Sequence, residues 1–185
     1  MNRIPIQRWT ESRMQYALTR KSNLFDFGRY SVVPNVGWGL GLNHEPDLLC
    51  LSKTGIFHEV EIKVTMADLK IDKEKWHNHY ARFVKHLWFA VPDILDTDKV
   101  LSEIPDYAGL AQVSTYYNEH PFDQQYSRQK YSTRIIRKPR PKLRKGLFTD
   151  PKQDTIIKFL RLGVLRMWTD THRFKHFDQQ VILKG

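Results

Sequence analysis

Two acidic residues and one lysine have the spacing that a metal-dependent phosphodiesterase would use: Asp47, Glu61 and Lys63. Side chains alternate across a strand, so Glu61 and Lys63 share one face, with roughly 6 to 7 Å between their Cα atoms. If Asp47 begins the neighbouring strand, its carboxylate converges with that of Glu61. Two carboxylates beside an ammonium suit magnesium, which takes one or two protein carboxylates and completes its shell with water and substrate phosphate. The pattern therefore predicts a magnesium site at which Lys63 orients the attacking water or offsets transition-state charge.

Two strands joined by a tight turn must position these residues. The apolar run Pro46 to Ser52 is typical of a buried strand, with the proline at its beginning. Gly55 supplies the positive φ of the turn, and a second strand is predicted from Ile56 to about Thr65. The alternative is that Asp47 lies in a turn and that the charged residues of the second strand form a solvated face. The apolar surroundings favour a metal, which would compensate an otherwise costly buried charge.

At these residues the chain resembles the PD-(D/E)XK nuclease superfamily, whose signature is Pro-Asp on one strand and (Asp/Glu)-x-Lys on the next. The matching residues are Pro46-Asp47 and Glu61-Ile62-Lys63. Residues 64–80 resemble the following helix of small bacterial and phage members, including the MmcB-like DNA-repair branch. Residues 104–110 and 136–140 resemble their late strands, so that the similarity spans roughly residues 30 to 140.

The resemblance implies an α/β fold of the restriction-endonuclease-like type, with a central mixed sheet flanked by helices. It also implies a magnesium-dependent DNA endonuclease of repair, recombination or mobile-element processing, in which manganese can substitute. Asp47 and Glu61 would be metal ligands, often with the Ile62 carbonyl as a third, and Lys63 the catalytic base or stabiliser. Glu59, a second acid on the same strand face, leaves open which glutamate binds the metal. Glu61 is preferred because its spacing to Lys63 matches the signature.

A first helix is predicted over residues 10–21, with Thr10 or Ser12 as N-cap and an inward face of Met14, Ala17 and Leu18. Glu11 and Gln15 lie one turn apart on the same side of this helix. The resemblance makes Glu11 a candidate for an additional metal ligand. The alternative is that Glu11 only complements the helix dipole.

The chain is basic and predicts a polyanionic partner. Its 185 residues carry 30 Lys and Arg against 20 Asp and Glu, giving a net charge of +10 and a pI near 9.7. Nine basic residues and no acid lie between positions 128 and 145: Arg128, Lys130, Arg134, Arg137, Lys138, Arg140, Lys142, Arg144 and Lys145. Interleaved tyrosines favour phosphate contacts combined with base stacking, so DNA binding is predicted here, with RNA not excluded. Lys73 and His79 are further candidates for phosphate contacts.

Length predicts a single domain over residues 1–185, with a basic, tyrosine-containing arm at about 116–146. Further helices are predicted over 66–83 and 151–168, strands over 25–36, 86–92 and 109–114, and a short strand near 181–183. The N-terminus lacks the apolar core of a signal peptide and no apolar run could span a membrane. A cytoplasmic location is therefore expected, and the resemblance implies a bacterial cell or phage-infected host. The single cysteine, Cys50, excludes an internal disulfide and favours an inert core residue.

Two rival interpretations remain open at the level of sequence. One is a catalytically inactive nucleic-acid-binding domain of the same fold. The other is a basic assembly protein that binds DNA or RNA without a metal. The broad apolar face of the last predicted helix covers the sheet or pairs with a second copy, and symmetric double-strand cleavage would require such a homodimer.

Overall fold

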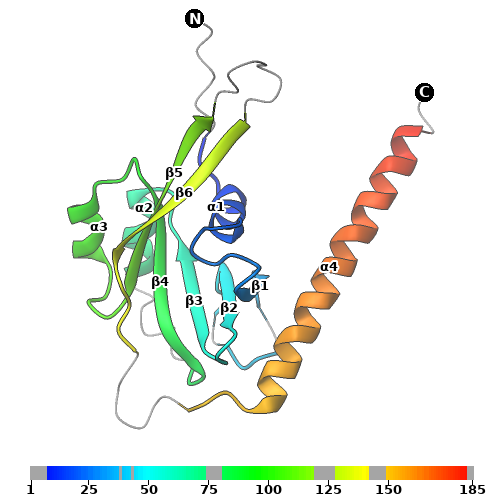
Figure 1. Ribbon diagram of the computed structural model, residues 1–185, viewed down its shortest axis with the longest axis horizontal. Coiled ribbons are helices and arrows are strands. Elements are labelled where there is room, and N and C mark those ends of the chain that lie inside the picture. Colours follow the sequence, from blue (N-terminus) through cyan, green and yellow to red (C-terminus); the bar gives the residue numbers. More distant parts are fainter. Residues whose placement is uncertain are drawn as a thin grey trace, which may run out of the picture.

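The computed structural model describes residues 8–37, 39–42, 44–73, 81–118, 128–141 and 149–182, with the backbone alone at 72–73, 117–118, 128–129 and 168–182. The elements follow one another along the chain (Figure 1): α1 (Glu11–Thr19), β1 (Tyr30–Pro34), β2 (Leu48–Ser52), β3 (Phe57–Ile62), α2 (Met66–Lys73), β4 (Val84–Pro92), α3 (Thr97–Glu103), β5 (Gly109–Asn118), β6 (Arg128–Arg137) and α4 (Gln153–Ile182). None of the described helices is long and apolar enough to cross a membrane.

The six strands form one mixed sheet whose spatial order is the order of the sequence, from β1 to β6. The first three strands pair antiparallel, β3, β4 and β5 pair parallel, and β6 returns antiparallel to β5. Parallel neighbours need a crossover connection, which α2 and α3 provide. The predicted α/β class, a central mixed sheet flanked by helices, is therefore confirmed.

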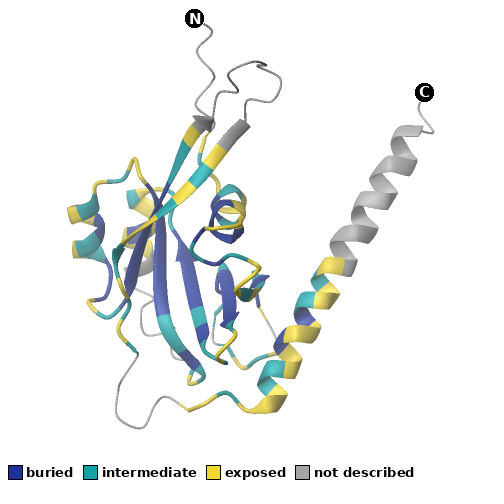
Figure 2. Cartoon of the chain, in the orientation of Figure 1, coloured by how far each residue is buried: buried dark blue, intermediate teal, exposed yellow. Residues whose placement is uncertain are grey.

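Helices cover both faces of the sheet. On one face, α1 packs Met14 and Leu18 against Leu48 of β2 and Val60 of β3. On the other face, Phe159 of α4 packs with residues of β1, β2 and β3, and the side chains of α2 and α3 pack with those of β4 and β5. Figure 2 shows the central strands as the most deeply buried part of the chain. The hairpin that carries the predicted site thus lies in the middle of a three-layer structure.

The predicted hairpin is formed by β2 and β3, with Leu48 opposite Val60 and Leu51 opposite Phe57. β2 begins at Leu48, later than the predicted Pro46. Its turn contains Gly55 at φ +79°, a backbone conformation that favours glycine. β3 ends at Ile62, earlier than the predicted Thr65. Thr65 instead begins α2, because its Oγ1 accepts the amide hydrogen of Asp68 at 3.1 Å and donates to Asp68 Oδ2 at 2.7 Å.

Several predicted boundaries are wrong. β1 covers only Tyr30–Pro34, and Phe25 reaches the core from a turn. The helix predicted to reach Phe83 is α2, described to Lys73, and a turn at 82–83 precedes β4. α4 extends to Ile182, so the short strand predicted near the end is wrong at 181–182. No glycine or proline follows Gly163 until the last residue of the chain, so no helix-breaking residue ends α4 sooner.

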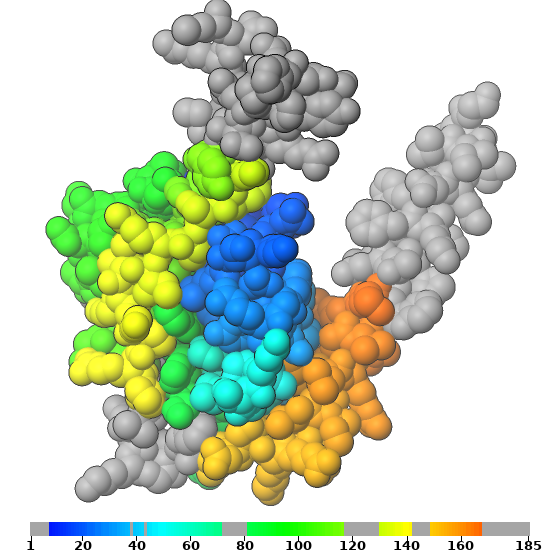
Figure 3. All heavy atoms as spheres, viewed as in Figure 1, coloured from blue at the N-terminus to red at the C-terminus, as the bar shows by residue number. Residues whose placement is uncertain are grey.

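The hairpin of β5 and β6 extends the sheet into the predicted arm, whose residues 116–118 and 128–137 form antiparallel strand. Its inner part contacts α1: the Arg13 Nε donates to the Tyr131 hydroxyl at 3.2 Å, and the guanidinium lies over the Trp9 ring. Figure 3 shows the surfaces of α1 and β6 side by side. The homodimer that the sequence left open is not tested by a single chain.

Candidate functional site

The two strands of the hairpin bring Asp47 and Glu61 to the same end of the sheet. Leu48 pairs with Val60, so Asp47 lies one step further along, at the level of Glu61. The Asp47 Oδ2 accepts a hydrogen bond from the backbone N–H of Ile62, with 2.5 Å between the two atoms. Asp47 thus contacts the strand that carries Glu61, and the predicted convergence of the two carboxylates stays a prediction.

Glu61 and Lys63 form an ion pair. The Lys63 Nζ lies 3.2 Å from Glu61 Oε2, and only 6% of the Glu61 side chain and 13% of the Lys63 side chain are exposed. The amide of Lys63 donates to the Ala90 carbonyl of β4 at 3.0 Å, which holds the residue against the sheet beyond the end of β3. The alternative of a solvated strand face is therefore wrong.

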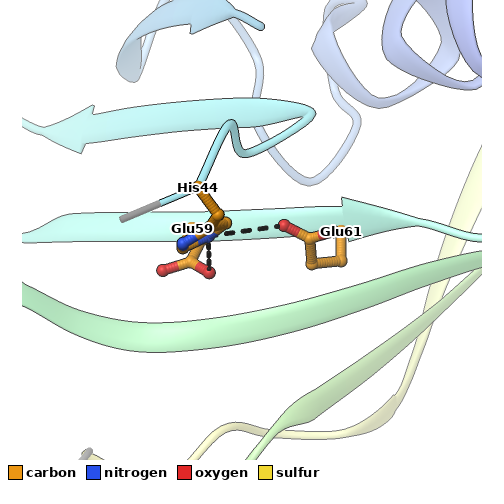
Figure 4. Close-up of side chains that lie close together, drawn as sticks. All are labelled: His44, Glu59 and Glu61. Carbon is orange, nitrogen blue, oxygen red and sulfur yellow. Dashed lines mark hydrogen bonds and ion pairs between the residues drawn. The ribbon is translucent and has the colours of Figure 1, made fainter. Parts of the chain in front are cut away.

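His44 is a site residue that sequence reasoning missed. Its imidazole reaches from the loop between β1 and β2 over β3, and Nε2 lies 2.8 Å from Glu59 Oε1 and 3.8 Å from Glu61 Oε1 (Figure 4). Glu59 is fully buried. The only sequence signal for this contact is position, since His44 lies three residues before Asp47 and follows Gly39 and Gly41.

These side chains supply a donor set suitable for a divalent cation. Among the described residues, His44, Glu59 and Glu61 form the one group of three whose ligand atoms all lie within 4.8 Å of one another. Carboxylate oxygens suit magnesium and manganese, so the residues present fit a metal of the predicted kind. Asp47 lies outside this group, at the Ile62 amide, and its role as a ligand stays a prediction.

Glu11 approaches the same end of the sheet from α1, where Thr10, one of the two predicted candidates, is the N-cap. Its Oε1 lies 3.1 Å from Gln15 Nε2 and 3.1 Å from Asn35 Nδ2. Gln15 Nε2 lies 2.9 Å from the Asp47 carbonyl. The backbone N–H of Asn35 donates to that same carbonyl at 3.2 Å. Gln15 and Asn35 therefore position the backbone of Asp47, a role for Asn35 that the sequence did not indicate. Glu11 as a metal ligand is untested.

The model of the MmcB-like family, described as DNA repair protein MmcB-like, matches residues 5–139. The chain belongs to this family. The MmcB-like match covers α1 to β6 and contains all the acids of the site, whereas α4 lies beyond it.

No curated protein is found to match the chain. A solved structure, the SPO1766 protein of unknown function from Silicibacter pomeroyi, has a TM-score of 0.58 and 14% sequence identity over 93% of this chain and 94% of that one. At this identity the likeness shows that the two proteins share a fold.

The basic residues at the end of the MmcB-like region fall into two classes. Three arginines make internal contacts: Arg134 with Gln112 Oε1 at 2.9 Å, Arg137 with the carbonyls of Ala108 at 2.8 Å and Pro105 at 2.6 Å, and Arg140 with Asp106 Oδ2 at 2.5 Å. Lys130 and Lys138 are exposed, and so are Arg134 and Arg140, whereas Arg137 is half-buried. Outside the described residues lie Lys142, Arg144, Lys145 and His79, and the side chains of Lys73 and Arg128.

Proposed function

We propose that this protein is a divalent-metal-dependent endonuclease of the PD-(D/E)XK type that hydrolyses phosphodiester bonds of DNA. The observation that carries the proposal is that Asp47, Glu61 and Lys63 all lie at one end of the β2–β3 hairpin. The Asp47 carboxylate accepts a hydrogen bond from the backbone N–H of Ile62, and the Lys63 ammonium forms an ion pair with Glu61. Membership of a DNA repair family supports DNA as the substrate.

Asp47 and Glu61 would hold the metal in this proposal, with Glu59 and Glu11 as further candidates. A bound divalent cation polarises the scissile phosphate and acidifies a water molecule. The carboxylates suit this task because they are fixed: Asp47 by a backbone N–H and Glu61 by its ion pair with the neighbouring lysine.

Lys63 contributes a positive charge of the protein itself to the site, in addition to that of the metal. Its ammonium is held by Glu61 in a largely buried position, where electrostatic interactions are stronger than in water. In this position Lys63 orients the attacking water and stabilises the negative charge that develops on the phosphate oxygens. A neutral side chain of similar length would keep the packing and lose both effects.

The exposed lysines of β6 and of the segment that follows it would guide the DNA backbone. Lys130 and Lys138 are exposed, and the whole chain has a net charge of +10. Lysines at such positions contact phosphates without distinguishing sequences. The internally bonded Arg134, Arg137 and Arg140 stabilise the β5–β6 region in addition to any contact with DNA.

Incubation of supercoiled plasmid with the purified protein tests the activity. We expect nicking with magnesium or manganese, none with a chelator, and a loss of at least about 100-fold in Lys63→Met. The matched control is Lys53→Met, since Lys53 is an exposed lysine in the turn of the same hairpin. DNA binding without metal-dependent nicking in the wild type would overturn the proposal and support a catalytically inactive DNA-binding domain.

A further inference from the structure

The imidazole of His44 lies over the two glutamates of β3, and nothing in the nuclease proposal uses it. We propose that His44, Glu59 and Glu61 bind a first-row divalent transition metal such as manganese, with the imidazole Nε2 as a nitrogen ligand. This inference deepens the proposed function and rests on it in one respect, namely that Glu61 belongs to the metal site. It names the class of metal and adds two ligands to the Asp-Glu-Lys signature.

The distances within the group suit shared coordination. Ligand atoms bound to one cation at about 2.0 to 2.2 Å lie roughly 3 to 4.3 Å from one another. His44 Nε2 is 2.8 Å from Glu59 Oε1 and 3.8 Å from Glu61 Oε1, and all three ligand atoms lie within 4.8 Å of one another. Small side-chain adjustments would therefore bring the three atoms to one ion.

The position of Glu59 also indicates a cation. Glu59 pairs with Leu49 on one side and Leu87 on the other, and all three residues are fully buried. A carboxylate in such surroundings requires strong compensation. Among the described residues at this end of the hairpin, three are acids, Asp47, Glu59 and Glu61, and one is a lysine, Lys63, so a divalent cation would balance the formal charge of these four.

The loop that carries His44 is closed at its base and passes close to α4. Its base is closed by the hydrogen bond between the Asn35 amide and the Asp47 carbonyl. Gly39 and Gly41 have φ values of +87° and +70°, and a Cβ at Gly39 would lie 3.7 Å from Leu162 of α4. From this loop the imidazole lies over β3 and contacts Glu59 at 2.8 Å, the position that a ligand at this site would need.

A nitrogen ligand changes which metal the site prefers. Carboxylates and water suit magnesium, calcium and manganese, whereas imidazole suits transition metals. A set of one imidazole and two carboxylates thus favours manganese or zinc over magnesium. The alternative is that His44 only hydrogen-bonds Glu59 to hold the loop.

Binding of manganese to the full chain distinguishes these two roles. The probe is manganese chloride alone, followed by calorimetry and by pulsed electron paramagnetic resonance, which detects a coordinated imidazole nitrogen. His44→Gln is the decisive variant because its amide can still donate to Glu59 but cannot act as a comparable ligand. Glu59→Gln removes the second ligand, and Glu45→Gln, an exposed acid next to His44, is the matched control.

We expect the manganese Kd to rise at least about tenfold in His44→Gln and in Glu59→Gln. In His44→Gln the magnesium Kd should rise less than the manganese Kd, because only the nitrogen ligand is lost. The nitrogen signal should be present in the wild type and in Glu45→Gln and absent in His44→Gln. Thermal melting of each metal-free variant shows whether it is folded. Unchanged manganese affinity and an unchanged spectrum in folded His44→Gln would overturn the inference.

The inference and the nuclease proposal can fail separately. One outcome is plasmid nicking that depends on Asp47, Glu61 and Lys63 but not on His44, with manganese affinity unchanged in His44→Gln. This outcome overturns the inference and supports the nuclease proposal. Manganese binding that depends on His44 in a protein that never nicks DNA supports the metal site and overturns the nuclease.

Discussion

The carboxylate of Asp47 accepts the amide hydrogen of Ile62, with 2.5 Å between Oδ2 and the nitrogen. This contact joins the residue before β2 to the last residue of β3, beyond the end of the regular hairpin pairing. Ile62 separates Glu61 from Lys63, so the contact also fixes the strand on which the other two predicted catalytic residues lie. One side chain therefore combines a structural role with the proposed catalytic one.

Replacing Asp47 by Asn should separate these two roles. The amide oxygen of Asn can still accept from Ile62, so we expect the free energy of unfolding to change by less than about 1 kcal/mol. Loss of the charge should lower divalent-metal affinity and cleavage at least about tenfold. Urea unfolding and calorimetry measure the two effects. Asp93→Asn, an exposed acid at the end of β4, is the control, and a metal affinity equal to that of the wild type would contradict a ligand role for Asp47.

Arg137 should contribute more to the stability of the protein than the neighbouring Lys138. Its guanidinium donates to the carbonyls of Ala108 and Pro105, and desolvation by burial is the main cause that lowers its pKa. Arg137→Ala leaves both carbonyls without this donor, which should cost about 1 to 3 kcal/mol. Lys138→Ala, at an exposed position, should change stability by less than about 0.5 kcal/mol. Equal urea midpoints for the two variants would exclude the structural role of Arg137.

The exposed lysines should govern the salt dependence of DNA binding. Each phosphate contact contributes close to one unit to the slope of log K against log salt. Lys130→Ala and Lys138→Ala should each lower this slope by about 1 and weaken binding similarly for all sequences. Fluorescence anisotropy at several salt concentrations measures the slope. An unchanged slope in the double variant would place the DNA elsewhere on the protein.

His58 should make stability depend on pH. Desolvation by burial, aided by the nearby charges of His86 and Lys85, lowers the pKa of His58 from 6.5 to about 3. The unfolded chain therefore takes up a proton first as the pH falls. The contribution of His58 is fully present above pH 6.5 and is lost between pH 6.5 and about 3, at up to about 1.4 kcal/mol per pH unit.

Urea unfolding of the wild type and of His58→Gln at pH 7, 6 and 5 tests this dependence. Glutamine does not titrate, and its amide oxygen can still accept from the Trp88 Nε1, which donates to His58 Nδ1 at 3.3 Å. We expect the wild type to lose more stability than the variant over this range. If the stability of the wild type and that of His58→Gln changed with pH in the same way, His58 would have the same pKa in the folded and unfolded states.

Cys50 should be unreactive in the folded protein. The thiol is fully buried in β2, and desolvation raises its pKa well above the ordinary value. The thiolate is the reactive form, so a thiol reagent such as Ellman's reagent should modify Cys50 only when the chain unfolds. The denaturant concentration at which modification becomes rapid should match the unfolding midpoint by circular dichroism. Fast labelling in the absence of denaturant would contradict the buried position.

The predictions that succeeded depend on local signals. Thr10 caps α1, Gly55 forms the hairpin turn, and the alternation after it puts Glu61 and Lys63 on one face. Each signal involves residues only a few positions apart, so propensity and periodicity were sufficient.

The features that were missed depend on residues distant in sequence. His44 meets Glu59 across fifteen positions through a glycine-containing loop whose path no periodicity describes. Arg137 bonds to Pro105 across thirty-two positions, so its sequence context indicated a nucleic-acid contact and not a structural one. The ends of β1 and α4 were wrong because Phe25 packs from a turn and because no helix breaker follows Gly163.

The loop between β1 and β2 determines the position of the His44 imidazole independently of the three carboxylates. Asp47, Glu59 and Glu61 are placed by strand register, whereas His44 is placed by the short segment that joins it to Asp47, three residues further along the chain. Lengthening this connection by a single residue, about 3.5 Å of chain, would withdraw the imidazole and leave the carboxylates where they are. Related chains could thus acquire or lose the nitrogen donor through one small insertion, with no change to the sheet.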